Sequence, residues 1–257
     1  MLPEKMCADA SEASQSGFLH DVFTVVPPRY DLINHLMTWG LDGRWRRMAA
    51  RECLVAKPER VLDLCCGTGD LALAIARLGG EGIEVLGIDY SQPMLAKAEL
   101  KAERSVNNKR LSFVCGDIAS IPFPDAYFDC IGISFAFRNL TYQNPLAGRY
   151  LAEVLRVLKT GGRFVILESS QPHPRPGFIK WLHHLYVRHF VFRLGWLVSS
   201  NKESYRYLAD SVVNFYGAEE LKKLLLEAGF DRVSFRHLFL GAAAIHVAVK
   251  EGASSGG

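Results

Sequence analysis

Apolar residues along this chain form short runs that alternate with helical patterns. From residue 60 the order is an apolar run at 60–64, a glycine-rich turn, an apolar helix and a second run at 85–89. Apolar runs of this length between turn residues indicate buried strands, so the segment predicts a βαβ unit. Two further strands are predicted at 111–115 and 128–134. Strands that alternate with helices favour a mostly parallel sheet covered on both faces.

The next segment continues the alternation with a longer helix. We expect this helix to begin at Asn144-Pro145 and to end at Gly161-Gly162, ahead of a strand at 163–168. Helical spacing places its apolar residues on one face, as expected for a helix that packs on a sheet. These residues are Leu146, Tyr150, Leu151, Val154, Leu155 and Leu158.

Near its end the chain changes from alternation to a hairpin pattern. An amphipathic helix ends at Gly229, and two predicted strands, 232–240 and 243–250, are joined at Gly241. The fold class predicted from these patterns is α/β: a doubly wound, Rossmann-like, mostly parallel seven-stranded sheet with an antiparallel C-terminal hairpin.

Two segments fall outside this scheme, 18–55 and 172–216, and together they contain all four tryptophans. We expect both to form a helical cap that covers the substrate. The polar start, 1–17, and the Gly/Ser-rich end, 251–257, are expected to be disordered tails. A length of 257 residues suits one large core, so residues 18–250 are predicted to form a single domain.

Composition narrows the classes of function. A content of 49% hydrophobic and 22% charged residues is that of a globular protein, and a net charge of +3 is too weak to predict a nucleic-acid partner. The six cysteines lack CxxC spacing, which favours reduced thiols and a cytoplasmic location. The chain opens with no signal peptide pattern and has no apolar run of about 18 residues, so we expect any membrane contact to be peripheral.

One stretch of the predicted cap has a composition suited to such contact. Residues 172–202 contain no acidic side chain, and their basic residues alternate with aromatic and aliphatic ones. A segment of this kind can lie on an anionic membrane surface, where it would guide a lipophilic substrate inward. A helical lid packed on its own domain is the alternative. A homodimer is also left open.

The chemistry suggested by the sequence centres on the turn after the first strand. Gly67, Thr68 and Gly69 stand where ligands bind in open parallel sheets, beyond a strand's carboxyl end. Asp89, followed by Tyr90, ends the second strand about 20 residues later, the spacing at which a carboxylate meets ribose hydroxyls. This pattern fits both NAD and S-adenosylmethionine (SAM).

Three features favour SAM over NAD. Asp63 lies at the end of the first strand, where its charge would repel a pyrophosphate but attract the ammonium of a methionine moiety. Asp117-Ile118, beyond the third strand, can offer a carboxylate and a backbone N–H to an adenine edge. The chain also ends in a hairpin and lacks a second nucleotide-binding half. No metal site is predicted.

The segment Val61-Leu-Asp-Leu-Cys-Cys-Gly-Thr-Gly-Asp70 resembles motif I of the quinone-biosynthesis C-methyltransferases of the UbiE/MenG type, which are class I SAM-dependent enzymes. The resemblance runs from about Phe23 to Lys250. It includes further matches: Tyr30-Asp31-Leu-Ile-Asn34 with Gly40 and Trp45; Phe135-Ala-Phe-Arg138-Asn139; Arg156 to Glu168 with Ser170; Ser204 to Ser211; and Gly241 with His246.

The resemblance implies roles for individual residues. Contacts to SAM are implied for Thr68, Asp89, Asp117, Ile118 and Ser134. Tyr30, Arg138 and Asn139 are implied to face a lipophilic polyprenyl quinol. The chain departs from the family pattern at Asp42-Gly43, at Thr160 and at Ser169. These departures leave the identity of the quinone open.

The chemistry of ring methylation fits these side chains. A ring carbon accepts a methyl group only when the arene is electron-rich, so the substrate must be a reduced quinol. Arg138 is expected to stabilise the developing oxyanion, Asn139 to orient it, and Tyr30 to hydrogen-bond a substrate hydroxyl. The general base is not assigned. His246 lies in an apolar strand and is expected to be a core residue.

The predicted function is methylation of demethylmenaquinol to menaquinol. The alternatives are methylation of 2-methoxy-6-polyprenyl-1,4-benzoquinol or of another lipophilic metabolite. From a different class, a non-catalytic SAM-binding scaffold subunit would keep Asp63 and Asp89 without needing Arg138 or Asn139. The expected location is the cytoplasm, with peripheral contact at the inner face of the membrane.

Overall fold

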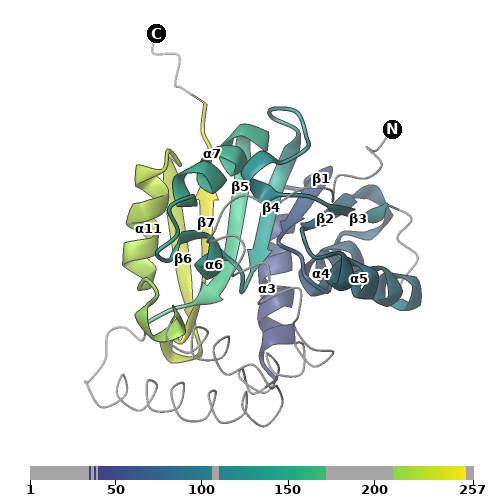
Figure 1. Ribbon diagram of the computed structural model, residues 1–257, viewed down its shortest axis with the longest axis horizontal. Coiled ribbons are helices and arrows are strands. Elements are labelled where there is room, and N and C mark those ends of the chain that lie inside the picture. The colour runs from purple at the N-terminus through teal and green to yellow at the C-terminus, as the bar shows by residue number, and fades with distance from the viewer. Residues whose placement is uncertain (1–34, 36–37, 39, 106–109, 172–210, 253–257) are drawn as a thin grey trace.

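A computed structural model describes residues 35, 38, 40–105, 110–171 and 211–252 (Figure 1). One seven-stranded sheet runs through this part of the chain, in the order β3-β2-β1-β4-β5-β7-β6. Its strands are β1 (Arg60–Leu64), β2 (Glu84–Asp89), β3 (Leu111–Cys115), β4 (Phe128–Ser134), β5 (Leu158–Ser169), β6 (Arg232–Leu238) and β7 (Ala243–Val249).

The direction of each strand confirms the predicted fold class. β1 to β5 pair in parallel, with Val61 opposite Val85 on one side and Cys130 on the other. β7 runs antiparallel to both β5 and β6, so the last two strands form the predicted edge hairpin. The strand order reverses between β1 and β4, which is the switch point where doubly wound sheets bind ligands.

Helices cover both faces of the sheet because successive residues of a buried strand point to opposite sides. Leu62 of β1 belongs to the core under α6, α7 and α11, whereas Val61 packs with α3 and α4 on the other face. The helices are α3 (Asp42–Leu54), α4 (Asp70–Gly79), α5 (Gln92–Ser105), α6 (Phe137–Thr141), α7 (Ala147–Val157) and α11 (Ala218–Glu227), with 3-10 turns η1 (Gly80–Gly82), η2 (Ile118–Ser120) and η4 (Phe239–Gly241).

The boundary between α7 and β5 corrects the sequence prediction. Leu158 was expected on the helix, but the helix ends at Val157 and Leu158 pairs with Phe128 as the first residue of β5. Gly161-Gly162 does not separate helix from strand but lies within β5, where both glycines exchange backbone hydrogen bonds with Lys250. Gly161 has φ +78°, so the pair forms a bend inside the strand.

The predicted hairpin strand 232–240 is also shorter than expected. β6 ends at Leu238, and Phe239 and Leu240 adopt left-handed backbone angles, φ 38° and 57°. Bulky residues rarely occupy this region because their Cβ crowds the backbone. The turn η4 lies at the carboxyl edge of the parallel strands, since the start of β7 pairs with the end of β5.

Several predictions fall outside the described residues. They are the tail 1–17, the stretch 172–202 for which membrane contact is expected, Tyr30, and most of the cap segments 18–55 and 172–216. The described part of the first cap segment includes α3, which packs against β4, β5 and α4. No helix among the described residues is long and apolar enough to cross a bilayer.

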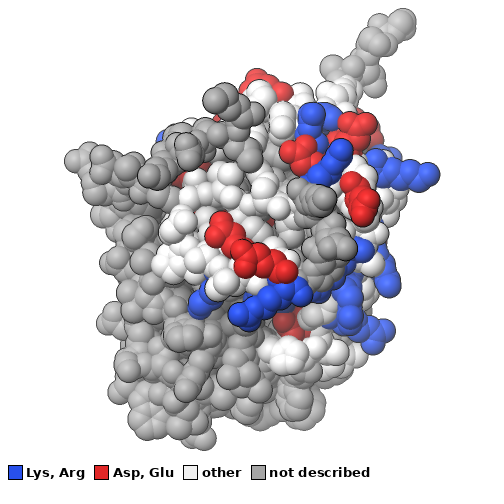
Figure 2. Space-filling model, turned by 90° about the vertical axis from the view of Figure 1, so that its right-hand side faces the viewer, with Lys and Arg blue, Asp and Glu red and all other residues white. Residues whose placement is uncertain are grey.

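Surface charge and cysteines add two observations. Figure 2 shows acidic and basic side chains side by side among uncharged ones on the described part of one face. Among the described cysteines, Cys53, Cys65, Cys66 and Cys130 are free thiols, whereas Cys115 is disulfide-bonded, so the expectation of reduced thiols is wrong at Cys115.

Candidate cofactor and substrate site

The turn between β1 and α4 needs glycine for its conformation and for space. Gly67 and Gly69 have φ +53° and +79°. A Cβ on Gly69 would lie 3.0 Å from Ala98 and from the ring of Phe113, whereas a Cβ on Gly67 would meet nothing within 4 Å. Gly69 therefore lets α4 start close to α5 and β3, and Gly67 leaves its backbone open toward a ligand.

Asp89 lies directly beside this turn, as predicted. Its Oδ2 accepts a hydrogen bond from the Gly67 N–H at 2.8 Å, and its Oδ1 accepts one from the Ser91 N–H at 2.9 Å. Burial raises the pKa of Asp89, and the backbone N–H groups oppose that rise. Each oxygen keeps a lone pair for a ribose hydroxyl. Tyr90, the next residue, is 37% exposed at the same edge.

Asp63 is almost completely buried at this edge, only 1% exposed. Its Oδ2 accepts a hydrogen bond from the Ala72 N–H at 2.9 Å, but its Oδ1 is buried and has no hydrogen-bond partner among the described residues. Burial raises the pKa of this carboxyl to about 8. A buried acceptor without a donor is unfavourable, and a bound ammonium group would satisfy it. The residues present therefore fit the methionine end of SAM.

The residues predicted to bind adenine follow β3. The Asp117 carboxylate accepts a hydrogen bond from the Ala119 N–H at 2.8 Å and is otherwise on the exposed surface, and Ile118 is buried beside it. The half-buried Ser134 ends β4 on the other side of β1. Because β3, β2, β1 and β4 are neighbours, the structure brings these residues to one edge with Asp63 and Asp89.

Thr68 contacts a residue that sequence reasoning missed. Lys101 on α5 donates hydrogen bonds of 2.7 Å to the Thr68 hydroxyl and to Asp70. The lysine thus ties the glycine turn to α5. Nothing in the helical pattern around Lys101 distinguishes it from an ordinary surface lysine, so no sequence signal identified it.

Arg138 is buried, and its partners are the second set that sequence reasoning missed. The side chain is 4% exposed, and Nη1 donates to Glu168 Oε1 at 3.0 Å and to Ser169 Oγ at 3.1 Å. The Arg138 backbone N–H also donates to Glu168 Oε2 at 3.1 Å. Both partners end β5. Glu168 is the last residue of the family match that begins at Arg156, so the signal for Glu168 was present in the sequence, whereas Ser169 is one of the departures from the family pattern.

The remaining predicted residues have simpler surroundings. Asn139 is half-buried on α6 next to Arg138, so the structure places the two predicted substrate residues together. The His246 imidazole is buried on β7, bonded to the Ala218 carbonyl at 2.9 Å, and its pKa is lowered to about 4 by burial. It is a neutral core residue, as predicted. No cluster of potential metal ligands occurs in the part of the chain described here.

The fold and the site together define a class I SAM-dependent methyltransferase. The sheet order, the antiparallel C-terminal hairpin and the acids at the ends of β1 and β2 around a glycine turn are the features of that class. A SAM-dependent methyltransferase of Aquifex aeolicus superposes with a TM-score of 0.56 at 20% identity, over 85% of this chain and 96% of that one, which shows the shared fold.

Sequence comparison gives the family. Residues 9–250 match the ubiE/COQ5 methyltransferase family, and the chain belongs to it. It is 42% identical over 226 residues to a demethylmenaquinone methyltransferase of Thermus thermophilus, covering 88% of this chain and 98% of that one. It is 38% identical over 238 residues to the ubiquinone/menaquinone biosynthesis C-methyltransferase UbiE of Yersinia enterocolitica, covering 92% of each. These findings confirm the predicted family and cofactor.

Proposed function

We propose that this chain transfers a methyl group from SAM to a ring carbon of a prenylated quinol, with demethylmenaquinol as the first candidate. The observation that carries the proposal is the buried side chain of Arg138. Arg138 lies on α6, shortly after the last β4 residue Ser134, and it forms an ion pair with Glu168 of β5. Relatives along nearly the whole chain methylate demethylmenaquinone or act in ubiquinone and menaquinone biosynthesis, as their names state.

An apolar row beside the cofactor edge suits a lipophilic acceptor. The Trp45 ring lies 6.3 Å from the rings of both Phe135 and Phe239, measured between centroids. Phe135 follows Ser134 directly, and Leu240, next to Phe239, is 68% exposed. Apolar side chains therefore extend from the end of β4 to the turn η4. Such a row can contact a quinol ring and the first units of its tail.

The ion pair explains how Arg138 would act. SAM, when bound, supplies a methyl group on a positively charged sulfur. As that methyl moves to the ring carbon, a quinol that has lost or shared its hydroxyl proton gives up negative charge, and the ring carbon then releases its hydrogen as a proton. Glu168 and Ser169 fix the Arg138 guanidinium on one side, while its Nε is buried and donates to no partner among the residues described here. A fixed guanidinium with an unused donor can stabilise the phenolate.

Two other proposals concern residues outside the described part. Tyr30 is proposed to hydrogen-bond a quinol hydroxyl. The stretch 172–202 is proposed to touch the inner face of the membrane from a cytoplasmic location. Cosedimentation with anionic liposomes tests this contact: reversing Arg188 and Arg193 to Glu should reduce it, and unchanged binding would refute it.

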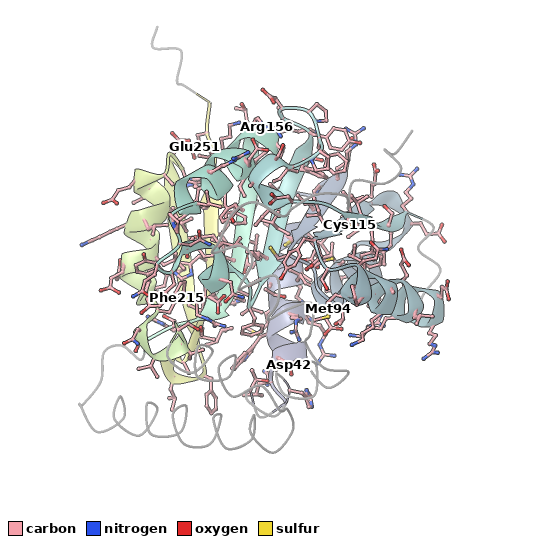
Figure 3. All side chains as sticks on the ribbon, in the orientation of Figure 1. Asp42, Met94, Cys115, Arg156, Phe215 and Glu251 are labelled. Atoms are coloured by element: carbon pink, nitrogen blue, oxygen red, sulfur yellow. The ribbon has the colours of Figure 1, made fainter. Side chains whose placement is uncertain are left out.

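The decisive experiment is methyl transfer from labelled SAM to two acceptors in parallel. These are reduced demethylmenaquinol and 2-methoxy-6-polyprenyl-1,4-benzoquinol, each with wild type, Arg138→Ala and Arg232→Ala. Arg232 is a matched control because it is an exposed arginine of β6 paired with Glu251, at the edge opposite the site in Figure 3. Label in one quinone, lost only with Arg138→Ala, supports the proposal.

Other outcomes point to the alternatives. SAM binding without transfer to either quinol, but with transfer to another lipophilic phenol, would indicate a different metabolite as substrate. SAM binding without any transfer would favour a non-catalytic scaffold subunit. The buried Arg138–Glu168 pair argues against that alternative, because a scaffold gains nothing from a charged pair held at the cofactor edge.

A further inference from the structure

Arg46 on α3 is a buried cation with an unused donor. The residue is 8% exposed, its Nη1 lies 2.5 Å from Asp42 Oδ2, and the same nitrogen is 3.7 Å from Asp70 Oδ2. Its Nε is fully buried and has no hydrogen-bond partner in the part of the chain that the structure describes. A guanidinium keeps its charge at all ordinary pH values, so a buried donor left unpaired is unfavourable unless a ligand satisfies it.

The surroundings of Arg46 place it at the cofactor edge. Its guanidinium carbon lies 5.4 Å from the ring centroid of Phe135, the residue after Ser134. Asp70, its second acidic neighbour, follows Gly69 directly. Burial raises the pKa of Asp63, and the Arg46 charge opposes part of that rise, so the two side chains are close enough to interact. The guanidinium therefore lies between the glycine turn after β1 and the end of β4.

We propose that Arg46 binds the carboxylate of the methionine moiety of SAM while Asp63 binds its ammonium. The inference rests on the cofactor part of the proposed function. An amino-acid zwitterion needs one anion and one cation side by side, and each of these two residues has a buried polar atom without a partner. Asp42 occupies Nη1 and fixes the guanidinium, which leaves Nε for the incoming carboxylate.

Asp42 fixes the position of the Arg46 side chain in this protein. Its carboxylate also contacts the His35 ring at 2.8 Å and the Thr38 hydroxyl at 3.2 Å. Asp42 is one of the residues at which the sequence departs from the family pattern. Figure 3 shows Asp42 at the end of α3 that lies toward the carboxyl edge of the sheet. The departure therefore concerns the cofactor side as well as the substrate side.

The alternative is that Arg46 only joins α3 to α4 through its ion pair with Asp70. Ligand chemistry separates the two, because decarboxylated SAM keeps the ammonium, sulfonium and adenosine but lacks the carboxylate. Dissociation constants for SAM, S-adenosylhomocysteine and decarboxylated SAM are measured by calorimetry. The proteins are wild type, Arg46→Gln, Arg46→Lys and Arg47→Gln, an exposed neighbour on the same helix.

The proposal predicts that wild type binds SAM at least about 10-fold more tightly than decarboxylated SAM. Arg46→Gln should weaken SAM and S-adenosylhomocysteine by roughly 10- to 100-fold and change decarboxylated SAM by less than about 3-fold. Arg46→Lys should recover part of the loss, and Arg47→Gln should behave as wild type.

Three results would overturn the proposal. They are no wild-type preference for SAM over decarboxylated SAM, equal losses for both ligands in Arg46→Gln, and no loss for either. The wild-type preference needs no variant, so it stands even where Arg46→Gln fails to fold. These binding ratios are independent of methyl transfer, so loss of quinol methylation with an intact SAM preference would refute the substrate proposal alone.

Discussion

Replacing Asp63 with Asn should stabilise the free protein and weaken its hold on SAM. The pKa of this carboxyl rises from 3.8 to about 8 in the fold because burial removes its hydration. Between those pH values the folded protein keeps a proton that the unfolded chain has released. Folding stability therefore falls as pH rises through this window, by about 1.4 kcal/mol per pH unit for one proton. An amide of the same shape does not titrate.

The size of the effect follows from that slope. Asp63→Asn should gain about 3 kcal/mol of unfolding free energy over wild type between about pH 5.5 and about pH 7.5. The amide keeps the hydrogen bond from the Ala72 N–H. The difference between the two proteins is the quantity to measure. His246, whose pKa is lowered to about 4, gives both of them an opposite slope below its usual 6.5.

Urea unfolding at both pH values measures the stability, with Asp125→Asn as control because Asp125 is an exposed acid paired with Arg156 at the opposite edge. Calorimetry at neutral pH should show SAM binding weakened roughly 10- to 100-fold by Asp63→Asn, since the ammonium loses its anionic partner. A stability difference that does not grow with pH, or SAM affinity that is unchanged, would refute the reasoning.

Three further changes test other parts of the site. Glu168→Gln should lower kcat about 10- to 100-fold and leave the SAM dissociation constant within about twofold, because it loosens Arg138 without touching the cofactor. Steady-state kinetics measures kcat, and calorimetry measures the dissociation constant. Gly69→Ala should lower the unfolding free energy by about 1–3 kcal/mol because of φ +79° and the contact with Phe113, and Gly148→Ala, with open space, is its control. His246→Phe should leave kcat unchanged and flatten the loss of stability in acid, because the wild-type imidazole must stay neutral to remain buried.

Each of these has an outcome that would contradict it. For Glu168→Gln, equal falls in kcat and SAM affinity would mean that the pair supports the whole site. For Gly69→Ala, stability equal to that of Gly148→Ala would mean that the turn can relax. For His246→Phe, a large loss of kcat with normal SAM binding would assign the histidine to catalysis.

The sheet and the cofactor edge could be predicted from the sequence because their signals are local. Strand β1, the glycine turn and Asp89 lie within about 30 residues, and their spacing alone brings Asp89 to the turn. The end of α7 was predicted wrongly because Leu158 continues the apolar face of the helix. Its pairing with Phe128, far away in sequence, decides that it belongs to β5.

The partners of the predicted residues could not be found in the same way. Lys101 reaches Thr68 from a different helix, and Arg46 reaches the end of β4 from a segment that precedes the whole sheet. No periodic pattern records such contacts, because they depend on how α3 and α5 pack. Arg138 and Glu168 both lie in sequence segments that match the family, but their pairing follows from the adjacency of β4 and β5.

The strand order also places the proposed cofactor residues and the proposed acceptor residues on different strands of the sheet. The acids proposed to bind SAM lie at the ends of β1 and β2 and after β3, all on one side of the switch point, whereas Arg138 and Glu168 belong to the β4 and β5 side. A substitution at Ser169 can therefore alter the chemistry offered to a methyl acceptor while the registers that hold Asp89 against Gly67 stay intact. In such a fold, substitutions on the β4 and β5 side can change the methyl acceptor while the β1 to β3 side keeps binding the methyl donor.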